Sequence, residues 1–236
     1  MLQGKNIYKQ INGLQILKDI NIRVEPSKIS CLIGPSGSGK STIISCLSLL
    51  SYPSKGTVTL NGQDYSFDGN GRDNRKFPYP AVTVVFQGIF LFPHLTNEKN
   101  ILLPLLEQKK DISGYDALVD RLKLRNILKK HPNECSGGEK QRVALARHIL
   151  LEPQYILLDE VTSALDLETI GIVADLLVEL KNKGIAILLA THLINLAKKI
   201  GDDFYFIDKG QIVETGKIEQ LSYPETDRLK TFTQLL

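Results

Sequence analysis

The stretch that decides the fold is Gly34-Pro35-Ser36-Gly37-Ser38-Gly39-Lys40-Ser41, and Thr42 follows it directly. It matches the pattern G-x-x-x-x-G-K-[ST] at every fixed position. The apolar run at 29–33 precedes it and predicts a buried strand. Helical spacing follows the loop, at Ile43, Ile44, Leu47 and Leu50. A strand, a glycine-rich loop and a helix in this order predict a loop that wraps a polyphosphate.

Each residue type in this loop has a task in holding phosphate. Glycine lets the backbone curl tightly, so that several N–H groups can point inward at an anion. The start of the following helix adds the positive end of its dipole. We expect Lys40 to reach the β- and γ-phosphates and the Ser41 hydroxyl to ligate Mg²⁺. The loop therefore predicts a nucleoside triphosphate with Mg²⁺.

A second chemical signal is the apolar run at 155–158, which predicts a strand and ends in Asp159 and Glu160. Adjacent side chains at a strand end can point in different directions, so one carboxylate can face Mg²⁺ while the other faces a water. Beside a phosphate loop, we expect Asp159 to assist Mg²⁺ and Glu160 to orient or deprotonate the attacking water. On their own, the two acids would fit the cap of a following helix equally well.

The rest of the chain predicts an α/β fold. Strands that alternate with helices imply a mostly parallel sheet covered on both faces. Alternation at 20–24 and the hairpin signal Asn61-Gly62 after 57–60 make the front part antiparallel. From 97 to 151 the pattern is helical, which predicts a helical insert. The other expected elements are strands at 82–86 and 185–190, a hairpin of 204–207 with 211–215, helices at 167–183 and 193–200, and a loop at 68–80.

Composition narrows the function classes. The 236 residues carry a formal net charge of only +3, without a basic run longer than a pair, so we expect no nucleic-acid groove. Cys31, Cys46 and Cys135 are odd in number and lack C-x-x-C spacing, which predicts free thiols in a reducing compartment. The apolar stretches are far shorter than the roughly 20 residues of a membrane span. Any membrane role is therefore expected to need a partner.

The segment Cys135-Ser136-Gly137-Gly138-Glu139 resembles the signature motif of ABC ATPases, whose usual form is L-S-G-G-Q or L-S-G-G-E. The stretch at 141–147 that follows is also similar to this family. A hydroxyl and bare backbone at a helix start offer a second anion site. In ABC ATPases this site serves the nucleotide held by the partner subunit. The resemblance therefore implies a head-to-tail dimer with two ATP molecules sandwiched between the subunits.

The remaining family motifs follow in the family's order, so the resemblance covers nearly the whole chain. It implies that Tyr8 stacks on adenine, that His192 contacts the γ-phosphate, and that Gln87 senses Mg²⁺ and the attacking water. The implied residues are, for ATP, Tyr8, Gly34, Pro35, Ser36, Gly37, Ser38, Gly39, Lys40, Ser41 and Thr42; for Mg²⁺, Ser41, Gln87 and Asp159; for catalysis, Lys40, Gln87, Glu160 and His192; for the partner's nucleotide, Ser136, Gly137, Gly138 and Glu139; and for the D-loop at the dimer interface, Asp166.

Two positions depart from the family pattern. Cys135 replaces the usual leucine of the signature, but a small thiol can still pack at an apolar position, so we expect activity to survive. Val161 replaces the proline that usually follows the catalytic glutamate, and we expect a looser link to the D-loop. The histidines His94, His131 and His148 match no catalytic position of the family and are expected on the surface or in loops.

The implied fold is that of a P-loop NTPase of the RecA-like kind. Its mostly parallel sheet core carries an antiparallel β front part and a helical insert with the signature motif. We expect one ABC ATPase domain over 1–236. Within it, 1–87 and 155–221 form the catalytic core, about 88–154 the helical subdomain, and 222–236 a C-terminal tail.

Two further segments, 92–96 and 224–232, resemble bacterial ATPases for polar amino-acid uptake. The resemblance implies an ATP-hydrolysing motor, peripheral at the cytoplasmic face of the inner (plasma) membrane. Its implied partners are a second ATPase subunit, identical or paired, integral membrane permease subunits and, through them, an extracytoplasmic solute-binding protein, with no nucleic acid.

Several other functions stay open at this point. A lipoprotein-release or cell-division complex has a similar ATPase core, and an ABC ATPase can also act on nucleic acid or the ribosome. A regulatory nucleotide-binding module would lack Glu160 or His192, and both are present. The Ser136-Gly137-Gly138 turn argues against a P-loop kinase.

Overall fold

The computed structural model describes residues 1–69 and 78–234, and its elements follow the predicted order. The strands are β1 (Leu2–Ile11), β2 (Leu14–Val24), β3 (Ile29–Ile33), β4 (Lys55–Leu60), β5 (Gln63–Phe67), β6 (Val82–Val85), β7 (Tyr155–Asp159), β8 (Ala186–Thr191), β9 (Asp203–Asp208) and β10 (Gln211–Lys217). The helices are α1 (Lys40–Leu47), α2 (Asn97–Glu107), α3 (Tyr115–Arg121), α4 (Gly137–Ile149), α5 (Leu167–Asn182), α6 (Ile194–Ile200) and α7 (Asp227–Gln234), with short 3₁₀ turns at Arg125–Ile127, Pro132–Glu134 and Ile218–Ser222.

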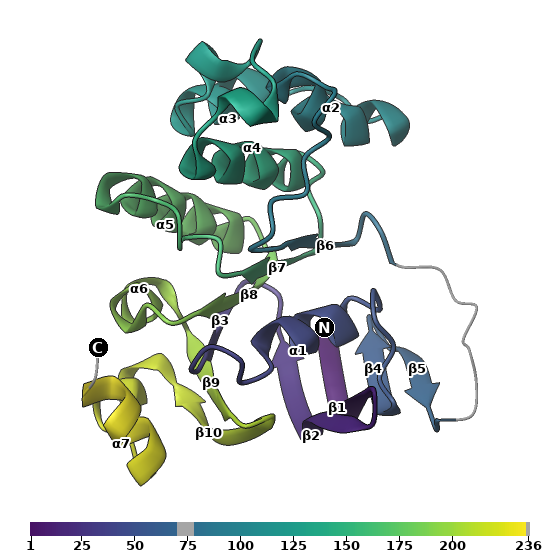
Figure 1. Cartoon of the computed structure of the whole chain (residues 1–236), viewed down its shortest axis with the longest axis vertical. Coiled ribbons are helices and arrows are strands. Elements are labelled where there is room, and N and C mark those ends of the chain that lie inside the picture. Colours follow the sequence, from purple (N-terminus) through teal and green to yellow (C-terminus); the bar gives the residue numbers. More distant parts are fainter. Residues whose placement is uncertain (70–77, 235–236) are drawn as a thin grey trace.

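Two sheets form the framework (Figure 1). The larger has six strands in the order β10-β9-β3-β8-β7-β6, and only β10 is antiparallel to its neighbour. The smaller is antiparallel, in the order β2-β1-β4-β5. Strands β3, β6, β7 and β8 are buried at every position, as expected for parallel strands covered on both faces. The predicted α/β class, with its antiparallel front part, is confirmed.

The larger sheet separates two hydrophobic cores. Successive residues of a strand point to opposite faces, so Ile156 and Leu158 join one core while Leu157 joins the other. The first core also contains side chains of α4, α5, α6 and α7. The second packs α1 and the antiparallel sheet against the opposite face. The sheet is therefore a rigid centre, and its strand ends hold fixed positions.

The helices α2, α3 and α4 lie together beyond the β6 edge of the sheet (Figure 1). Two ion pairs connect this helical part to α5. Lys123 Nζ lies 2.5 Å from Glu168 Oε1, and Arg121 pairs with Glu179. Exposed pairs of this kind contribute little stability each, at most about 1 kcal/mol. The buried apolar residues of α4 in the first core are the stronger attachment.

The C-terminal segment packs against the larger sheet. Leu229 and Phe232 of α7 are buried, and the Phe232 ring lies with its centroid 5.3 Å from that of Phe206 in β9. Arg228 Nε and Nη2 donate to the Asp208 carboxylate at 2.8 and 3.1 Å. This segment is therefore part of the folded core and completes the cover over β9.

A few details differ from the sequence predictions. Strand β1 was not predicted, because register shifts and a positive φ of 47° at Asn6 interrupt its alternation. Helix α1 ends at Leu47, so Leu50 lies outside it and is half exposed. The loop expected at 68–80 falls mostly outside the described residues. Among the helices described, none has the length and apolarity that crossing a membrane requires.

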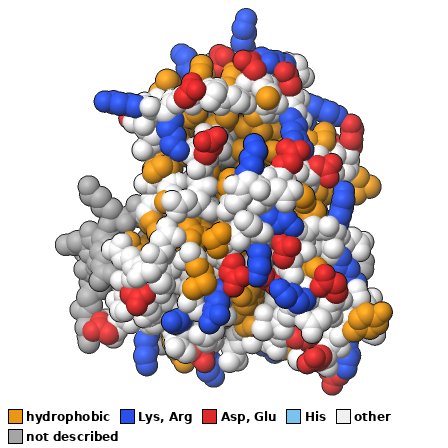
Figure 2. Space-filling view, turned by 180° about the vertical axis from the view of Figure 1, so that it is seen from behind, with side chains coloured by type: hydrophobic (Ala, Val, Ile, Leu, Met, Phe, Trp, Pro, Cys, Tyr) orange, Lys and Arg blue, Asp and Glu red, His pale blue; other side chains and the backbone are white. Residues whose placement is uncertain are grey.

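The face of the molecule opposite to that of Figure 1 carries charges of both signs. In Figure 2, Lys and Arg side chains are mixed with Asp and Glu side chains over this face, with hydrophobic side chains visible between them. Charges that alternate in sign partly cancel one another's field at a distance. A polyanion would therefore meet repulsion as well as attraction on this face.

Candidate active site

The predicted site residues gather where the parallel strands end. Ile33 at the end of β3 pairs with Thr191 of β8, and Asp159 at the end of β7 pairs with Ala190. The phosphate loop leaves β3 at this edge, Glu160 leaves β7, and His192 leaves β8. Ligands of open α/β sheets bind outside the carboxyl ends of the strands, so this edge is the expected place for chemistry.

Close packing explains two glycines of the loop. A Cβ added to Gly34 would lie 2.2 Å from the Ile207 carbonyl oxygen. Gly39, the N-cap of α1, has a φ of +112°, and an added Cβ there would lie 2.8 Å from Leu17 Cδ2. The loop is thus pressed against β2 and β9, which fixes its shape before any ligand arrives.

Lys40 turns back into the loop. Its side chain is only 4% exposed, and Nζ donates to the carbonyls of Gly34 at 2.9 Å and Pro35 at 3.0 Å. The same Nζ lies 3.2 Å from Glu160 Oε1. A buried ammonium needs such partners. The arrangement places a positive charge inside the curl of the loop, where an anion would meet it.

Asp159 and Ser41 fit a Mg²⁺ ion. Asp159 is buried, and its Oδ1 has no hydrogen-bond partner among the described residues. Burial and the neighbouring Glu160 raise the pKa of Asp159, whereas a hydrogen bond with Ser41 and the charge of Lys40 lower it. The described residues hold no cluster of three His, Cys, Asp or Glu side chains suited to a metal. One oxygen from Asp159 and one from Ser41 are enough for Mg²⁺, because this ion usually keeps several waters and takes further ligands from substrate phosphates.

Glu160 and His192 face each other across this site. Glu160 Oε2 lies 3.7 Å from His192 Nδ1, and its Oε1 faces Lys40. The Glu160 side chain is 13% exposed and that of His192 is 41% exposed, so water can reach the pair. Three of the four side chains that the sequence assigns to catalysis, Lys40, Glu160 and His192, are therefore brought together.

The signature turn begins α4. Ser136 is its N-cap, its Oγ accepts from Glu139 N at 3.2 Å, and Glu139 Oε2 accepts from Ser136 N at 2.7 Å. This reciprocal pair is a capping box. A Cβ added to Gly138 would lie 2.9 Å from the Ala164 carbonyl oxygen, so the turn packs closely on the segment that leads to Asp166. Ser136 and Gly137 are exposed. Among the described residues, neither a hydrogen bond nor an ion pair joins Ser136 to the phosphate loop.

Three other predicted residues lie on separate elements: Gln87 after β6, Asp166 at the start of α5 and Tyr8 in β1. Gln87 is exposed and follows β6 at the same sheet edge. Asp166 caps α5, its Oδ1 accepting from Thr169 N at 2.8 Å, and these hydrogen bonds lower its pKa. Tyr8, in β1, lines a pocket of about 510 Å³ with Gln10 and Lys55, whose Nζ lies 5.8 Å from the centre of the Tyr8 ring.

Gln141 is a supporting residue that the sequence reasoning missed. Its Nε2 donates to the Glu160 carbonyl at 3.3 Å from within α4, although the two residues are 19 apart in the chain. The sequence of 141–147 is similar to the family, but that similarity assigns no role to Gln141. Val161 is buried in the first core, where it anchors the chain directly after Glu160.

The three remaining histidines lie in different surroundings. His148 is in a helix rather than in a loop, and its side chain is partly exposed. It lies half-buried on α4, and its Nδ1 is 2.7 Å from the Ala144 carbonyl oxygen. His94 is exposed, and His131 lies beside Glu134 ahead of the signature turn.

Comparisons with known proteins agree on one family. The family described as ABC transporter matches residues 17–163. The L-cystine import ATP-binding protein TcyC of Bacillus subtilis is 35% identical over 98% of this chain and 97% of its own length. The glutamine transport ATP-binding protein GlnQ of the same organism is 34% identical, and the glutamate transport ATP-binding protein GluA of Corynebacterium efficiens is 35% identical, each with 98% of this chain and 97% of the relative covered.

Solved structures agree with this assignment. An ATP-binding cassette solved as a dimer in a post-hydrolysis state with ADP and Pi superposes with a TM-score of 0.82 at 29% identity, covering 92% of this chain and 99% of that one. An ATP-binding subunit of an ABC transporter gives a TM-score of 0.83 at 25% identity over 99% of both chains. The chain belongs to the ABC transporter family, as an ATP-binding subunit that hydrolyses ATP.

Proposed function

We propose that this chain is the motor subunit of a membrane importer for polar amino acids. The observation that carries the motor role is the meeting of three side chains at the phosphate loop, where Glu160 lies 3.2 Å from Lys40 and 3.7 Å from His192. Relatives that match nearly the whole chain are named for cystine, glutamine and glutamate transport, which supports amino acids as the substrate class.

In this proposal each residue of the site has one task. Lys40 leaves the carbonyls of Gly34 and Pro35 and pairs with the terminal phosphates of ATP, while loop N–H groups hold the phosphate oxygens. Asp159 and Ser41, with Gln87 nearby, would hold Mg²⁺, which neutralises phosphate charge when bound. Glu160 takes the proton of a water, and His192 stabilises the charge that develops on the γ-phosphate.

The signature turn would complete the site of a second subunit. Ser136, Gly137 and Gly138 are exposed or half-exposed at a helix start, where a hydroxyl and N–H groups suit an anion. Glu139 supports the turn through the capping box, and Asp166 supports the adjoining D-loop. Two chains, identical or paired, would sandwich two ATP molecules, with Tyr8 against adenine, and hydrolysis would open them again.

The permease would dock at a groove beside the helical subdomain. A pocket of about 400 Å³ is lined by Phe90, Phe92, Pro104 and Arg147 among others. Phe90 is 70% exposed, which is unusual for so large an apolar side chain. The groove lies within the proposed subdomain of about 88–154, set against the core of 1–87 and 155–221. Docked on the permease in this way, the chain would lie at the cytoplasmic face of the plasma membrane. It would be connected to a solute-binding protein through the permease.

The test is to tag the full chain in its own cell, extract membranes in mild detergent and identify what co-purifies. We expect a multi-span permease in stoichiometric amount. Phe90→Glu should abolish this recovery while leaving the ATPase activity of the purified chain intact, because Phe90 lies in the groove. The matched control is Tyr223→Glu, since Tyr223 is 84% exposed on the C-terminal segment.

Two other outcomes are informative. Recovery with ribosomes or DNA and without a permease would overturn the transporter role and leave the ATPase chemistry standing. Recovery of lipoprotein-release or cell-division proteins would support the ATPase motor role and overturn the assignment to amino-acid import.

A further inference from the structure

Two asparagines in the first turn of α2 are completely buried. Asn97 and Asn100 are each 0% exposed. A spacing of three residues places them on neighbouring positions of one helix face. Asparagine is seldom fully buried, because an unpaired amide in the interior is costly. The pair therefore calls for an explanation beyond helix formation.

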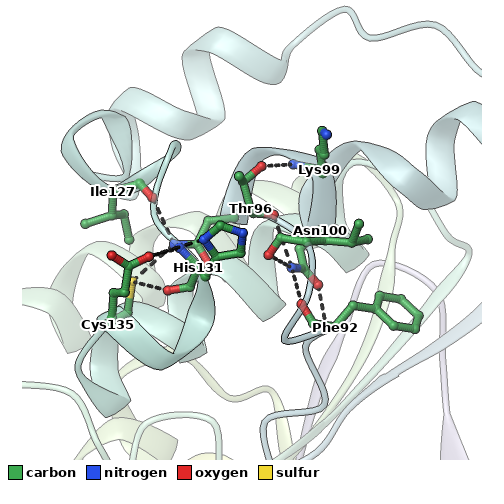
Figure 3. Close-up of polar contacts among 10 residues, drawn as sticks. Phe92, Thr96, Lys99, Asn100, Ile127, His131 and Cys135 are labelled. Carbon is green, nitrogen blue, oxygen red and sulfur yellow. Dashed lines mark hydrogen bonds and ion pairs between the residues drawn. The ribbon is translucent and has the colours of Figure 1, made fainter.

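Asn100 holds the segment that leads into α2. Its Nδ2 donates to the carbonyls of Phe92, Leu95 and Thr96 at 3.0, 3.2 and 3.1 Å, and its Oδ1 accepts from Phe92 N at 2.8 Å (Figure 3). The two N–H donors of the amide thus serve three carbonyls, one of them shared, and its oxygen accepts one bond. Asn100 thereby fixes the segment that carries Phe92 into the proposed permease groove.

Asn97 contacts a different segment, the one that precedes the signature turn. Its Nδ2 donates to the Ile127 carbonyl at 2.8 Å and to Cys135 Sγ at 3.1 Å. The Asn97 backbone N–H donates to the Lys130 carbonyl at 2.8 Å. The Cys135 thiol in turn donates to the His131 carbonyl at 3.6 Å. Asn97 alone thus attaches the segment 127–135 to α2 at three points.

The amide nitrogen is the part of Asn97 that matters. Asn97 Oδ1 has no hydrogen-bond partner among the described residues. The cost of this unpaired acceptor is offset by the two hydrogen bonds that Nδ2 donates. An aliphatic residue at 135, where the signature usually has leucine, would offer no acceptor to the amide. Asn97 and Cys135 therefore form a matched pair in this chain, although they are 38 residues apart.

We infer that Asn97 is a positioning residue for the signature turn, which it fixes through Cys135. Ser136 follows Cys135 directly and caps α4, so the position of Sγ sets the direction of the Ser136 hydroxyl. The inference rests on the proposed role of Ser136 at the nucleotide of the partner subunit. One helical turn then holds the groove segment with Asn100 and the signature turn with Asn97.

The experiment is a double-mutant cycle in the Glu160→Gln chain, in which we expect ATP to drive a lasting dimer. Sedimentation at saturating MgATP gives the dimer dissociation constant for Asn97→Leu, Cys135→Ala and the double variant. Cys135→Ala should weaken the dimer about fivefold to tenfold, the loss expected for one hydrogen bond, and Asn97→Leu, which also removes the bond to Ile127, by at least as much. The double variant should weaken it no further than Asn97→Leu alone, because both changes remove the same bond.

Two controls separate positioning from stability. Thr96→Ala removes the Thr96 Oγ1 acceptor of Lys99 N, 3.3 Å away, at the N-cap of the same helix. It should lower the melting temperature without weakening the dimer. Cys135→Ser keeps an acceptor for the amide and should retain dimer affinity, and this comparison with Cys135→Ala holds even where Asn97→Leu does not fold. MgATP binding to the dilute monomer should be unchanged throughout.

The outcomes distinguish the inference from its premise. Ser136→Ala tests the premise, and an unweakened dimer in that variant would remove the proposed role of Ser136. With Ser136→Ala weakening the dimer, the inference is overturned by additive losses in the cycle. It is equally overturned by an Asn97→Leu variant that behaves as Thr96→Ala does.

Discussion

Glu160 holds a backbone conformation that residues other than glycine seldom adopt. Its φ is +50°, its N–H donates to the Ala190 carbonyl at 3.0 Å, and its carbonyl accepts from Gln141. Such strain costs roughly 1–3 kcal/mol and persists only where neighbours impose it. Here β8 and α4 impose it, and the result is a carboxylate aimed at Lys40 and His192.

The first prediction concerns this carboxylate. Glu160→Gln keeps the size and hydrogen bonding of the side chain but removes the base, so ATP hydrolysis should fall about 10²-fold or more. MgATP binding, measured by calorimetry, should persist. Glu168→Gln is the control, because Glu168 is 77% exposed and pairs with Lys123 outside the site. Normal phosphate release from Glu160→Gln would show that another group activates the water.

His148 gives the second prediction, on pH. Burial lowers the pKa of His148 from 6.5 to about 4, and the nearby Arg147 acts in the same direction. Between pH 6.5 and 4, His148 is therefore protonated in the unfolded chain but remains neutral in the folded chain. The stabilisation is complete above pH 6.5 and is lost as the pH falls toward 4, by about 2–3 kcal/mol in all.

Urea unfolding at a series of pH values measures this loss. His148→Gln should flatten the profile between pH 6.5 and 4, because glutamine does not titrate there. His94→Gln is the matched control, since His94 is exposed and should leave the profile of the native chain unchanged. A profile that is equally steep in both variants would assign the acid sensitivity to other groups.

At the scale of elements, α4 shows how one residue serves structure and chemistry together. Ser136 is both the N-cap of the helix and the proposed contact to a partner's nucleotide. Glu139 closes the capping box and places a negative charge in the first turn, where the helix dipole favours it. The hydrogen bonds to Ser136 also hold the pKa of Glu139 below its usual range.

The third prediction follows from this box. Glu139→Ala removes the acceptor of Ser136 N and should lower the free energy of unfolding by roughly 0.5–2 kcal/mol. Urea titration measures the change, and Glu225→Ala is the control because Glu225 is exposed outside the helices. An unchanged midpoint would mean that water replaces the carboxylate at no cost.

Elements with strong local signals were predictable from the sequence. Strand β3 was predicted at its observed bounds because a continuous apolar run lies between two turns, and the β4–β5 hairpin follows from Asn61-Gly62. Strand β1 was missed because its irregular register hides the alternation. The residues proposed for catalysis carry motifs and could be named one by one. Contacts such as Gln141 with Glu160 could not, because they depend on how α4 packs on the sheet.

At the scale of the whole molecule, the C-terminal segment completes the core that covers β9. Leu229 is 0% exposed, and Phe232 packs on Phe206. The fourth prediction is that Leu229→Ala lowers the free energy of unfolding by about 2–4 kcal/mol, through lost burial and the cavity left behind. Lys230→Ala, at the exposed neighbouring position, should change it by less than about 0.5 kcal/mol. Similar values for the two variants would place this segment outside the cooperative unit.

The two cores also leave the native thiols out of reach. Cys31, Cys46 and Cys135 are all buried, and burial raises the pKa of Cys31 far above its usual value and that of Cys46 to about 12. Maleimides react with the thiolate, so Cys31 and Cys46 stay unlabelled at neutral pH in the folded chain, and burial shields Cys135 as well. Leu167→Cys, at a position that is 88% exposed beside the D-loop, would then carry a fluorophore alone. Without removal of any native cysteine, a single labelled position is thus available for single-molecule fluorescence measurements of how two copies associate and separate.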